Sequence, residues 1–216
     1  MLDRLRNFLL PSGHFRIARP TQGLPNCHIR SVRATDFDRC EEIYRANEKA
    51  HFPDGYLPRF SSWLRDQRAL ILVAEREGTV SAVCGISAQE QEGHHFAALS
   101  FGMVHPTLHR RGYGTALLLA RLSLLRTNKP QTFVVLSTTG GSERFYKRFG
   151  FKFVHALQPT PTYREEHYFA SVTSRDRARC AELLQHDVGL SADLAGEQVP
   201  DFSRLDTSVP VASTDV

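Results

Sequence analysis

A segment rich in glycine and arginine near the middle of the chain has the residue types of a site for a phosphorylated ligand. Arg110 and Arg111 directly precede Gly112, and Gly114 follows two residues later. Glycines at a strand-to-helix junction let the backbone turn and approach a ligand, and the free amides and dipole of the helix start attract an anion. The two arginines add fixed charge and paired donors. The segment therefore predicts a cradle for a pyrophosphate.

Positive charge is concentrated around this segment. The whole chain has a net charge of +4, but residues 105–152 contain nine Lys or Arg residues and a single acid, Glu143. Residues 173–216 are acidic by contrast, with eight Asp or Glu and four Arg. A concentrated basic block indicates an anionic partner. We expect a small ligand and no nucleic acid, because the charges gather on a glycine-rich turn rather than along a basic face with stacking aromatics.

Two common phosphate-binding loops do not match the segment. The P-loop pattern GxxxxGK[ST] is absent from the chain. The dinucleotide-binding pattern GxGxxG needs a third glycine at the position of Leu117, and no early strand–helix–strand unit surrounds the segment. An anion site of a different kind is therefore expected.

Residues 109–114 resemble the [QR]xxGxG signature of the GNAT superfamily of N-acetyltransferases. The end of the preceding strand, at Val104, and an FYxxxGF segment at residues 145–151 resemble the same family at the right spacing. The resemblance covers about residues 28–172. Two separate motifs make it specific.

The resemblance implies a substrate and a reaction. Acetyl-coenzyme A is the expected co-substrate, lying between two parallel strands at residues 96–104 and 132–137. Its acetyl group is expected to move to an amine by direct attack in a ternary complex, with a small-molecule or peptide amine as the acceptor. Holding both substrates together supplies much of the rate of such a reaction. The residues that the resemblance assigns to the cofactor are Met103, Val104, His109, Arg110, Arg111, Gly112, Tyr113, Gly114, Thr115, Thr139 and Phe145.

The same family often uses a tyrosine to protonate the departing thiolate, and the matching residue is Tyr146. A phenol suits this role because it holds its proton at neutral pH. The base that takes the proton of the amine stays open among Glu48, His51 and Asp54, in the connection between the first two expected helices. A water chain to solvent is an equal alternative.

Several positions depart from the family pattern. His109 stands where Gln or Arg is usual, and Thr139 and Ser142 stand where Asn and Ala are frequent. Ala98 occupies a strand position at which some members of the family carry a Glu that acts as the general base. These departures leave an alternative open, a catalytically silent acyl-coenzyme A sensor or scaffold with a GNAT-like fold. A longer acyl chain or an acceptor other than an amine also stays open.

The apolar patterns predict an α/β protein of the α+β mixed-sheet type, with one twisted sheet of about six or seven strands and helices on both faces. With 216 residues, 41% of them hydrophobic, the chain is long enough to bury a core. Residues 89–94 are polar and are expected to form a loop. Strands are expected at residues 28–33, 69–75, 80–87, 96–104, 132–137, 152–156 and 163–172. Helices are expected at residues 36–48, 59–67, 112–126, 142–149 and 174–187.

The chain is expected to divide into three parts. Residues 1–27 form a short N-terminal helix and an irregular lead-in, residues 28–172 form the acyltransferase domain, and residues 173–216 form a helix and a partly disordered acidic tail. No apolar run approaches the ~18 residues of a membrane helix, so stable membrane insertion is not expected. The four cysteines and ten histidines show no metal-ligand spacing, so no metal is expected. Without an export signal, the expected location is the cytoplasm.

Overall fold

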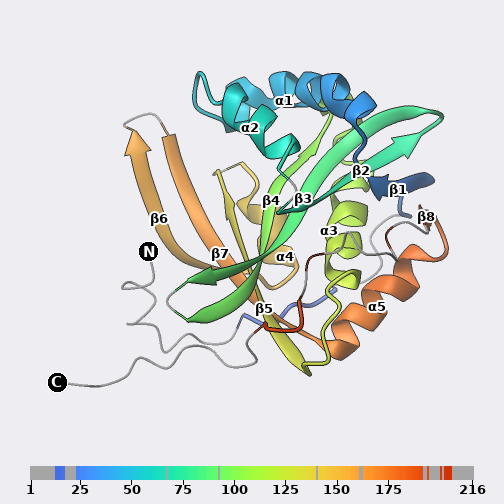
Figure 1. Ribbon diagram of the computed structural model, residues 1–216, viewed down its shortest axis with the longest axis vertical. Helices are drawn as coiled ribbons and strands as arrows, with labels where there is room; N and C mark the ends of the chain where they lie inside the picture. Colours follow the sequence, from blue (N-terminus) through green and yellow to red (C-terminus); the bar gives the residue numbers. More distant parts are fainter. Residues whose placement is uncertain are drawn as a thin grey trace.

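One mixed sheet of eight strands forms the centre of the protein (Figure 1). The computed structural model describes residues 13–17, 23–66, 68–91, 93–139, 141–160, 163–191, 194, 200 and 202–205. The strand order across the sheet is β6-β7-β5-β4-β3-β2-β1-β8. In chain order the strands are β1 (Cys27–Ser31), β2 (Leu70–Arg76), β3 (Thr79–Gln91), β4 (His94–Val104), β5 (Gln131–Thr138), β6 (Lys152–Thr160), β7 (Tyr163–Thr173) and β8 (Val188–Leu190).

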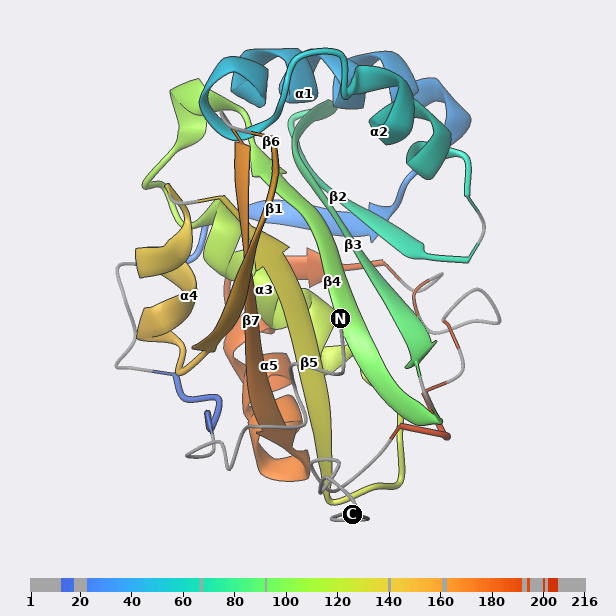
Figure 2. The same ribbon diagram turned by 90° about the vertical axis from the view of Figure 1, so that its left-hand side faces the viewer.

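Helices cover both faces of the sheet (Figures 1 and 2). On one face lie α1 (Phe37–His51) and α2 (Leu57–Leu64), and on the other lie α3 (Tyr113–Ser123), α4 (Glu143–Arg148) and α5 (Ser174–Leu184). The pairs β4–β5 and β1–β8 are parallel, and the other pairs are antiparallel. The predicted mixed sheet with helices on both faces is confirmed. Among the described residues, no helix is long and apolar enough to cross a membrane.

Two apolar layers hold the helices against the sheet. All residues of α3 from 115 to 122 are buried, because this helix lies between the sheet and α5. By contrast, α1 buries a single stripe against the opposite face, made of Cys40, Ile43, Tyr44 and Asn47. Spacings of three and four residues put these side chains on one side of a helix. The helix predicted at residues 36–48 is therefore confirmed, although it begins one residue later and ends three residues later than predicted.

The β3–β4 hairpin is longer than the sequence predicts. The prediction of a loop at residues 89–94 is wrong, because β3 and β4 stay paired as far as Gln91 and His94. Pairing here rests on the backbone, while residues 88–90 are exposed to solvent. The alternation of apolar and polar residues that marks a half-buried strand is therefore missing from this part of the sequence.

Other differences lie at the ends of elements. Helix α2 begins at Leu57, two residues before the predicted start, because Pro58 fits the first turn of a helix, where no backbone N–H is needed. It ends at Leu64 rather than at residue 67, and α3 ends at Ser123 rather than at residue 126. Strand β8 was not predicted, because an edge strand of three residues is too short to show a pattern.

Segments at both ends of the described chain pack onto the domain. The ring of Phe15 is buried and lies 6.1 Å, centroid to centroid, from that of Phe149. Leu194, Phe202 and Leu205 are buried at the C-terminal side. Residues 1–12, where the short N-terminal helix is predicted to begin, and the final residues, 206–216, lie outside the described residues.

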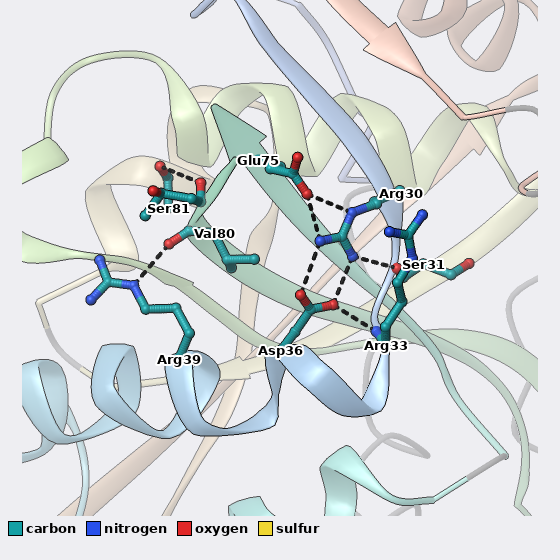
Figure 3. Close-up of polar contacts among 9 residues, drawn as sticks. Arg30, Ser31, Arg33, Asp36, Arg39, Glu75, Val80 and Ser81 are labelled. Carbon is teal, nitrogen blue, oxygen red and sulfur yellow. Dashed lines mark hydrogen bonds and ion pairs between the residues drawn. The ribbon is translucent and has the colours of Figure 1, made fainter. Parts of the chain in front are cut away.

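A buried ion-pair network fastens the start of α1 to the sheet (Figure 3). The guanidinium of Arg30 on β1 donates two hydrogen bonds to the carboxylate of Asp36, at 2.7 and 2.9 Å, and one to Glu75 on β2, at 2.8 Å. Asp36 also accepts from the backbone N–H of Arg33. Burial by itself would raise the pKa of Asp36, but the hydrogen bonds from Arg30 and Arg33 outweigh it and lower the pKa.

Asp36→Ala should lower the free energy of unfolding by about 3 kcal/mol, because it takes a partner from the buried Arg30 charge. Equilibrium urea unfolding measures this loss. A carboxylate with a lowered folded-state pKa stabilises above its unfolded pKa, and this contribution disappears as the pH falls through the folded value. The difference between wild type and variant should therefore shrink at acid pH. Asp38→Ala removes an exposed carboxylate nearby and should cost less than about 0.5 kcal/mol; equal losses in the two variants would contradict the account.

Candidate active site

The sheet opens between β4 and β5. These two parallel strands pair at residues 97–99 of β4, opposite residues 134–136 of β5. Beyond that point β4 continues to Val104 and β5 to Thr138, and no further pair joins them along their described lengths. Backbone N–H and C=O groups near the two strand ends are therefore available to a ligand that enters between them.

A bulge in β4 accompanies this opening. The register between β3 and β4 shifts so that Phe101 and Gly102 together stand opposite Cys84. Two residues facing one is the pattern of a β-bulge, which bends the strand and ends regular pairing. Phe101 has a φ of +42°, in the left-handed region that non-glycine residues rarely adopt. The bend accounts for the separation of the end of β4 from β5.

A cleft of about 950 Å³ occupies the opening. This volume is in the range of small-molecule binding sites. Its walls come from β4, β5, the start of α3, α4 and the connection between α1 and α2. All the residues predicted to hold the cofactor line it, namely Met103, Val104, His109, Arg110, Arg111, Gly112, Tyr113, Gly114, Thr115, Thr139 and Phe145.

Four consecutive backbone amides at the start of α3 lack an acceptor. Within the described part of the chain, the N–H groups of Gly112, Tyr113, Gly114 and Thr115 make no hydrogen bond, and the helix has no side-chain cap. The first amides of a helix have no intrahelical partner and carry the positive end of its dipole. Since they border the cleft, an anionic group placed there would satisfy them. This set of donors fits a pyrophosphate.

A glycine is needed at positions 112 and 114 for two different structural reasons. Gly112 has a φ of +87°, and a Cβ there would come within 3.0 Å of the Cδ atom of Pro25. A Cβ on Gly114 would lie 3.4 Å from the ring of Phe145 on α4. Gly112 is therefore required by the turn itself, whereas Gly114 allows α4 to pack closely on the start of α3.

Arg148 on α4 joins this end of the cleft. Its guanidinium donates to the hydroxyl of Thr115 at 2.8 Å and lies 4.7 Å from the ring centroid of Phe145 and 4.8 Å from that of Phe149. Burial lowers the pKa of Arg148, but a guanidinium stays charged. Arg148 was not predicted as a site residue, because nothing in the sequence separates it from its basic neighbours on the same helix.

The side chain of His109 is turned toward the strand. Its Nε2 atom lies 2.9 Å from the carbonyl oxygen of Val104 and donates to it, since a carbonyl can only accept. The amide of Asn47 on α1 donates to the same oxygen at 3.1 Å. These two contacts fix the end of β4 against α1 and the turn.

Tyr146 lies at the inner part of the cleft. Its side chain is buried and packs edge-on against Phe145 and Phe151. A Cβ added to Gly102 would lie 3.3 Å from the hydroxyl oxygen. The phenol is therefore directed at the bulge of β4, where the two strands separate.

Of the three candidate bases, His51 lines the cleft, whereas Glu48 and Asp54 are not among its lining residues. The Nδ1 atom of His51 lies 3.4 Å from the hydroxyl oxygen of Thr139. Burial, and to a smaller degree the nearby His109, lower the pKa of His51. Its imidazole is therefore neutral at pH 7 and able to accept a proton.

The α1 and α2 side of the cleft is aromatic. The rings of Phe52, Tyr56 and Phe101 pack against one another, with centroids 6.2 to 6.4 Å apart. The guanidinium of Arg59 lies 5.0 Å from the ring centroid of Tyr56. Glu165 on β7 brings a carboxylate to the same cleft. These residues were not predicted as part of the site, because their elements meet only in the folded chain.

Comparison with known proteins agrees with this geometry. The model of the Acetyltransferase (GNAT) family matches residues 37–151. The chain belongs to the GNAT family of acetyltransferases. The resemblance of its motifs to that family is confirmed, and the protein is a GNAT-type N-acetyltransferase. No curated protein matches it by sequence.

Solved structures of the GNAT family share the fold. A GNAT-family protein from Desulfovibrio desulfuricans superposes with a TM-score of 0.55 at 16% identity, over 65% of this chain and 96% of its own. The ribosomal-protein-S18-alanine N-acetyltransferase from Escherichia coli gives a TM-score of 0.50 at 21% identity, over 67% and 92%. The yncA protein from Salmonella typhimurium, solved with its cofactor acetyl-CoA, gives a TM-score of 0.50 at 17% identity, over 68% of this chain and 94% of its own. About a third of this acetyltransferase thus lies outside the shared part.

Proposed function

We propose that this GNAT acetyltransferase moves an acyl group from a coenzyme A thioester, with acetyl-coenzyme A as the donor the family implies, to an amine by direct attack in a ternary complex. The observation that carries the proposal is the row of four unbonded amides at the start of α3, which borders the cleft between β4 and β5. A helix start of this kind binds phosphate groups. The yncA structure, which holds acetyl-CoA on the same fold, supports the choice of cofactor.

Residues on three sides of the cleft would hold the cofactor. The amides of residues 112–115 would bind the pyrophosphate, and Arg110, Arg111 and Arg148 would add charge around it. The backbone of Met103 and Val104 would pair with the pantetheine arm. Because the Val104 carbonyl already accepts from Asn47 and His109, this strand end is held in one orientation.

The catalytic roles follow from position. Tyr146 would give its proton to the departing thiolate, since its hydroxyl faces the bulge. The backbone N–H groups at the end of β4 would polarise the thioester carbonyl. His51 would take the proton of the amine, because its lowered pKa keeps it neutral at pH 7.

The acceptor would enter from the α1 and α2 side. There the rings of Phe52, Tyr56 and Phe101 form an apolar wall, and Glu165 supplies a carboxylate that would attract a protonated amine. Burial raises the pKa of Tyr56; the nearby Arg59 opposes this effect, and the Glu165 carboxylate adds to it. A small-molecule or peptide amine fits this surface.

Gly114→Glu should lower the affinity for coenzyme A at least about a hundredfold, or ~2.7 kcal/mol, because it places an anion among the four amides. Isothermal titration calorimetry on the folded variant measures the change. Asn128→Glu adds the same charge at an exposed position beyond the other end of α3 and should leave the affinity within about twofold. A folded Gly114→Glu protein that binds coenzyme A as well as wild type would remove the basis of the proposal.

Tyr146→Phe should lower kcat by about a hundredfold and leave the Kd of acetyl-coenzyme A within about twofold, because it removes the acid and keeps the ring. Thiol release with a panel of amines, together with calorimetry, separates the two quantities. Tyr168→Phe removes a phenol whose hydroxyl binds Glu166 outside the cleft, and kcat should stay near wild type. Normal turnover of Tyr146→Phe would make Tyr146 a packing residue. Coenzyme A binding by wild type without thiol release for any amine would favour the silent acyl-coenzyme A sensor.

A further inference from the structure

A buried arginine lies at the inner end of the cleft. Arg121 on α3 is 2% exposed, yet it lines the cleft together with Gly102, Leu117 and Tyr146. A guanidinium is always protonated in proteins, so this side chain carries a full positive charge below the surface. Arginine is rarely buried to this degree unless an anion accompanies it.

Arg121 has no acidic partner in the part of the chain that the structure describes. Its Nε atom donates to the carbonyl of Leu117 at 3.3 Å and its Nη1 atom to the carbonyl of Gly85 at 3.5 Å. Both acceptors are neutral, and both distances exceed the usual ~2.9–3.0 Å. Nη2 makes no hydrogen bond to any described residue. Removing a charge from water without a counter-charge is costly, so the site is complete only when an anion reaches it.

The bulge of β4 brings the backbone of Gly102 next to this charge. Leu99 packs with α3, whereas Phe101 and Met103 pack with α1 and α2, so the extra residue returns Gly102 to the α3 face. A Cβ on Gly102 would lie 3.4 Å from Nη2 of Arg121 and 3.3 Å from the hydroxyl oxygen of Tyr146. The guanidinium and the phenol therefore approach the same backbone position, which only a glycine leaves uncrowded, and all three residues line the cleft.

The position of Arg121 along α3 indicates which substrate reaches it. Gly114, Leu117 and Arg121 line the cleft at intervals of three and four residues, on one side of the helix. Seven residues of helix measure about 10 Å, so Arg121 lies two turns deeper than the free amides. Phe52 and Tyr56, on the acceptor side, belong to the opposite face of the sheet. An anion at Arg121 is thus placed on the thioester side.

We propose that the acyl group transferred by this enzyme ends in a carboxylate, which Arg121 binds. The donor would be the coenzyme A thioester of a short dicarboxylic acid, such as malonyl- or succinyl-coenzyme A, in preference to acetyl-coenzyme A. A carboxylate matches the fork of donors on a guanidinium. The inference rests on the proposed function, since it requires a coenzyme A thioester in the cleft, and it refines the donor of that reaction.

The transfer itself is unchanged by the second carboxylate. The amine nitrogen forms a bond to the thioester carbonyl carbon, the carbon–sulfur bond breaks with its electron pair on sulfur, and Tyr146 gives a proton to that sulfur. The amine loses one proton to the base. The products are an amide with a free terminal carboxylate and the thiol of coenzyme A. Arg121 touches the acyl group and takes no proton.

Isothermal titration calorimetry on the full chain tests the inference with free coenzyme A and its acetyl, malonyl and succinyl thioesters. Wild type should bind malonyl- or succinyl-coenzyme A at least tenfold more tightly than acetyl-coenzyme A. Arg121→Met should remove this preference, keep the Kd of free coenzyme A within twofold and keep Tm at or above the wild-type value, since it removes a buried charge. Arg179→Met, on the exposed side of α5, should keep the preference. Arg121→Lys retains a charge and should keep part of the preference for carboxylated donors. It provides a second comparison if the methionine variant does not fold.

Each of the other possible results would overturn either the role of Arg121 or the proposed function. Equal affinity of wild type for acetyl and carboxylated donors, or a preference that survives both substitutions of Arg121, would overturn the role of Arg121 and leave coenzyme A binding standing. If Arg121→Met lost affinity for carboxylated amines and kept its donor preference, Arg121 would bind a carboxylate of the acceptor. That result would also overturn the proposed role of Arg121 toward the donor. Failure of wild type to bind any of the four ligands would overturn the proposed function together with the inference.

Discussion

The bulge at Phe101 and Gly102 is the feature on which the rest of the site depends. A regular β4 would continue to pair with β5 beyond residue 99, and the backbone groups that border the cleft would be used in the sheet. With the bulge, the two strand ends separate and leave these groups to a ligand. The same extra residue turns Gly102 toward Tyr146 and Arg121 and turns Phe101 toward the aromatic wall. One irregularity thus sets the opening, the inner space and the acceptor side.

Some basic residues of this protein line the cleft and others form ion pairs on the surface, and the sequence alone does not distinguish the two groups. Arg110, Arg111, Arg121 and Arg148 line the cleft. Lys147, by contrast, pairs with Glu143 on the outer surface of α4 at 3.0 Å. A surface pair of this type adds little to stability. Four of the nine basic residues in the block at residues 105–152 thus line the cleft, which is why the charge of the block indicates an anionic ligand.

Much of the fold could be predicted from the sequence, because apolar periodicity reports which side of an element faces a core. The glycine-rich helix start could be predicted as well, since a glycine directly after two arginines, as at Gly112, is typical of a tight turn before a helix. The polar extension of the β3–β4 hairpin and the short β8 carry no such pattern. Arg121 and Arg148 were missed because a buried and an exposed arginine look alike in a sequence. His51 could not be separated from Glu48 and Asp54, because the course of the α1–α2 connection decides which side chain faces the cleft.

The central claim is that the free amides of residues 112–115 hold the coenzyme A moiety, and amide hydrogen exchange tests it most directly. Mass spectrometry would follow peptides that cover this helix start, with and without saturating coenzyme A. The account predicts fast exchange in the free protein, because these N–H groups have no acceptor, and markedly slower exchange in the complex. Unchanged exchange at these amides in a protein that calorimetry shows to be saturated with coenzyme A would contradict the account.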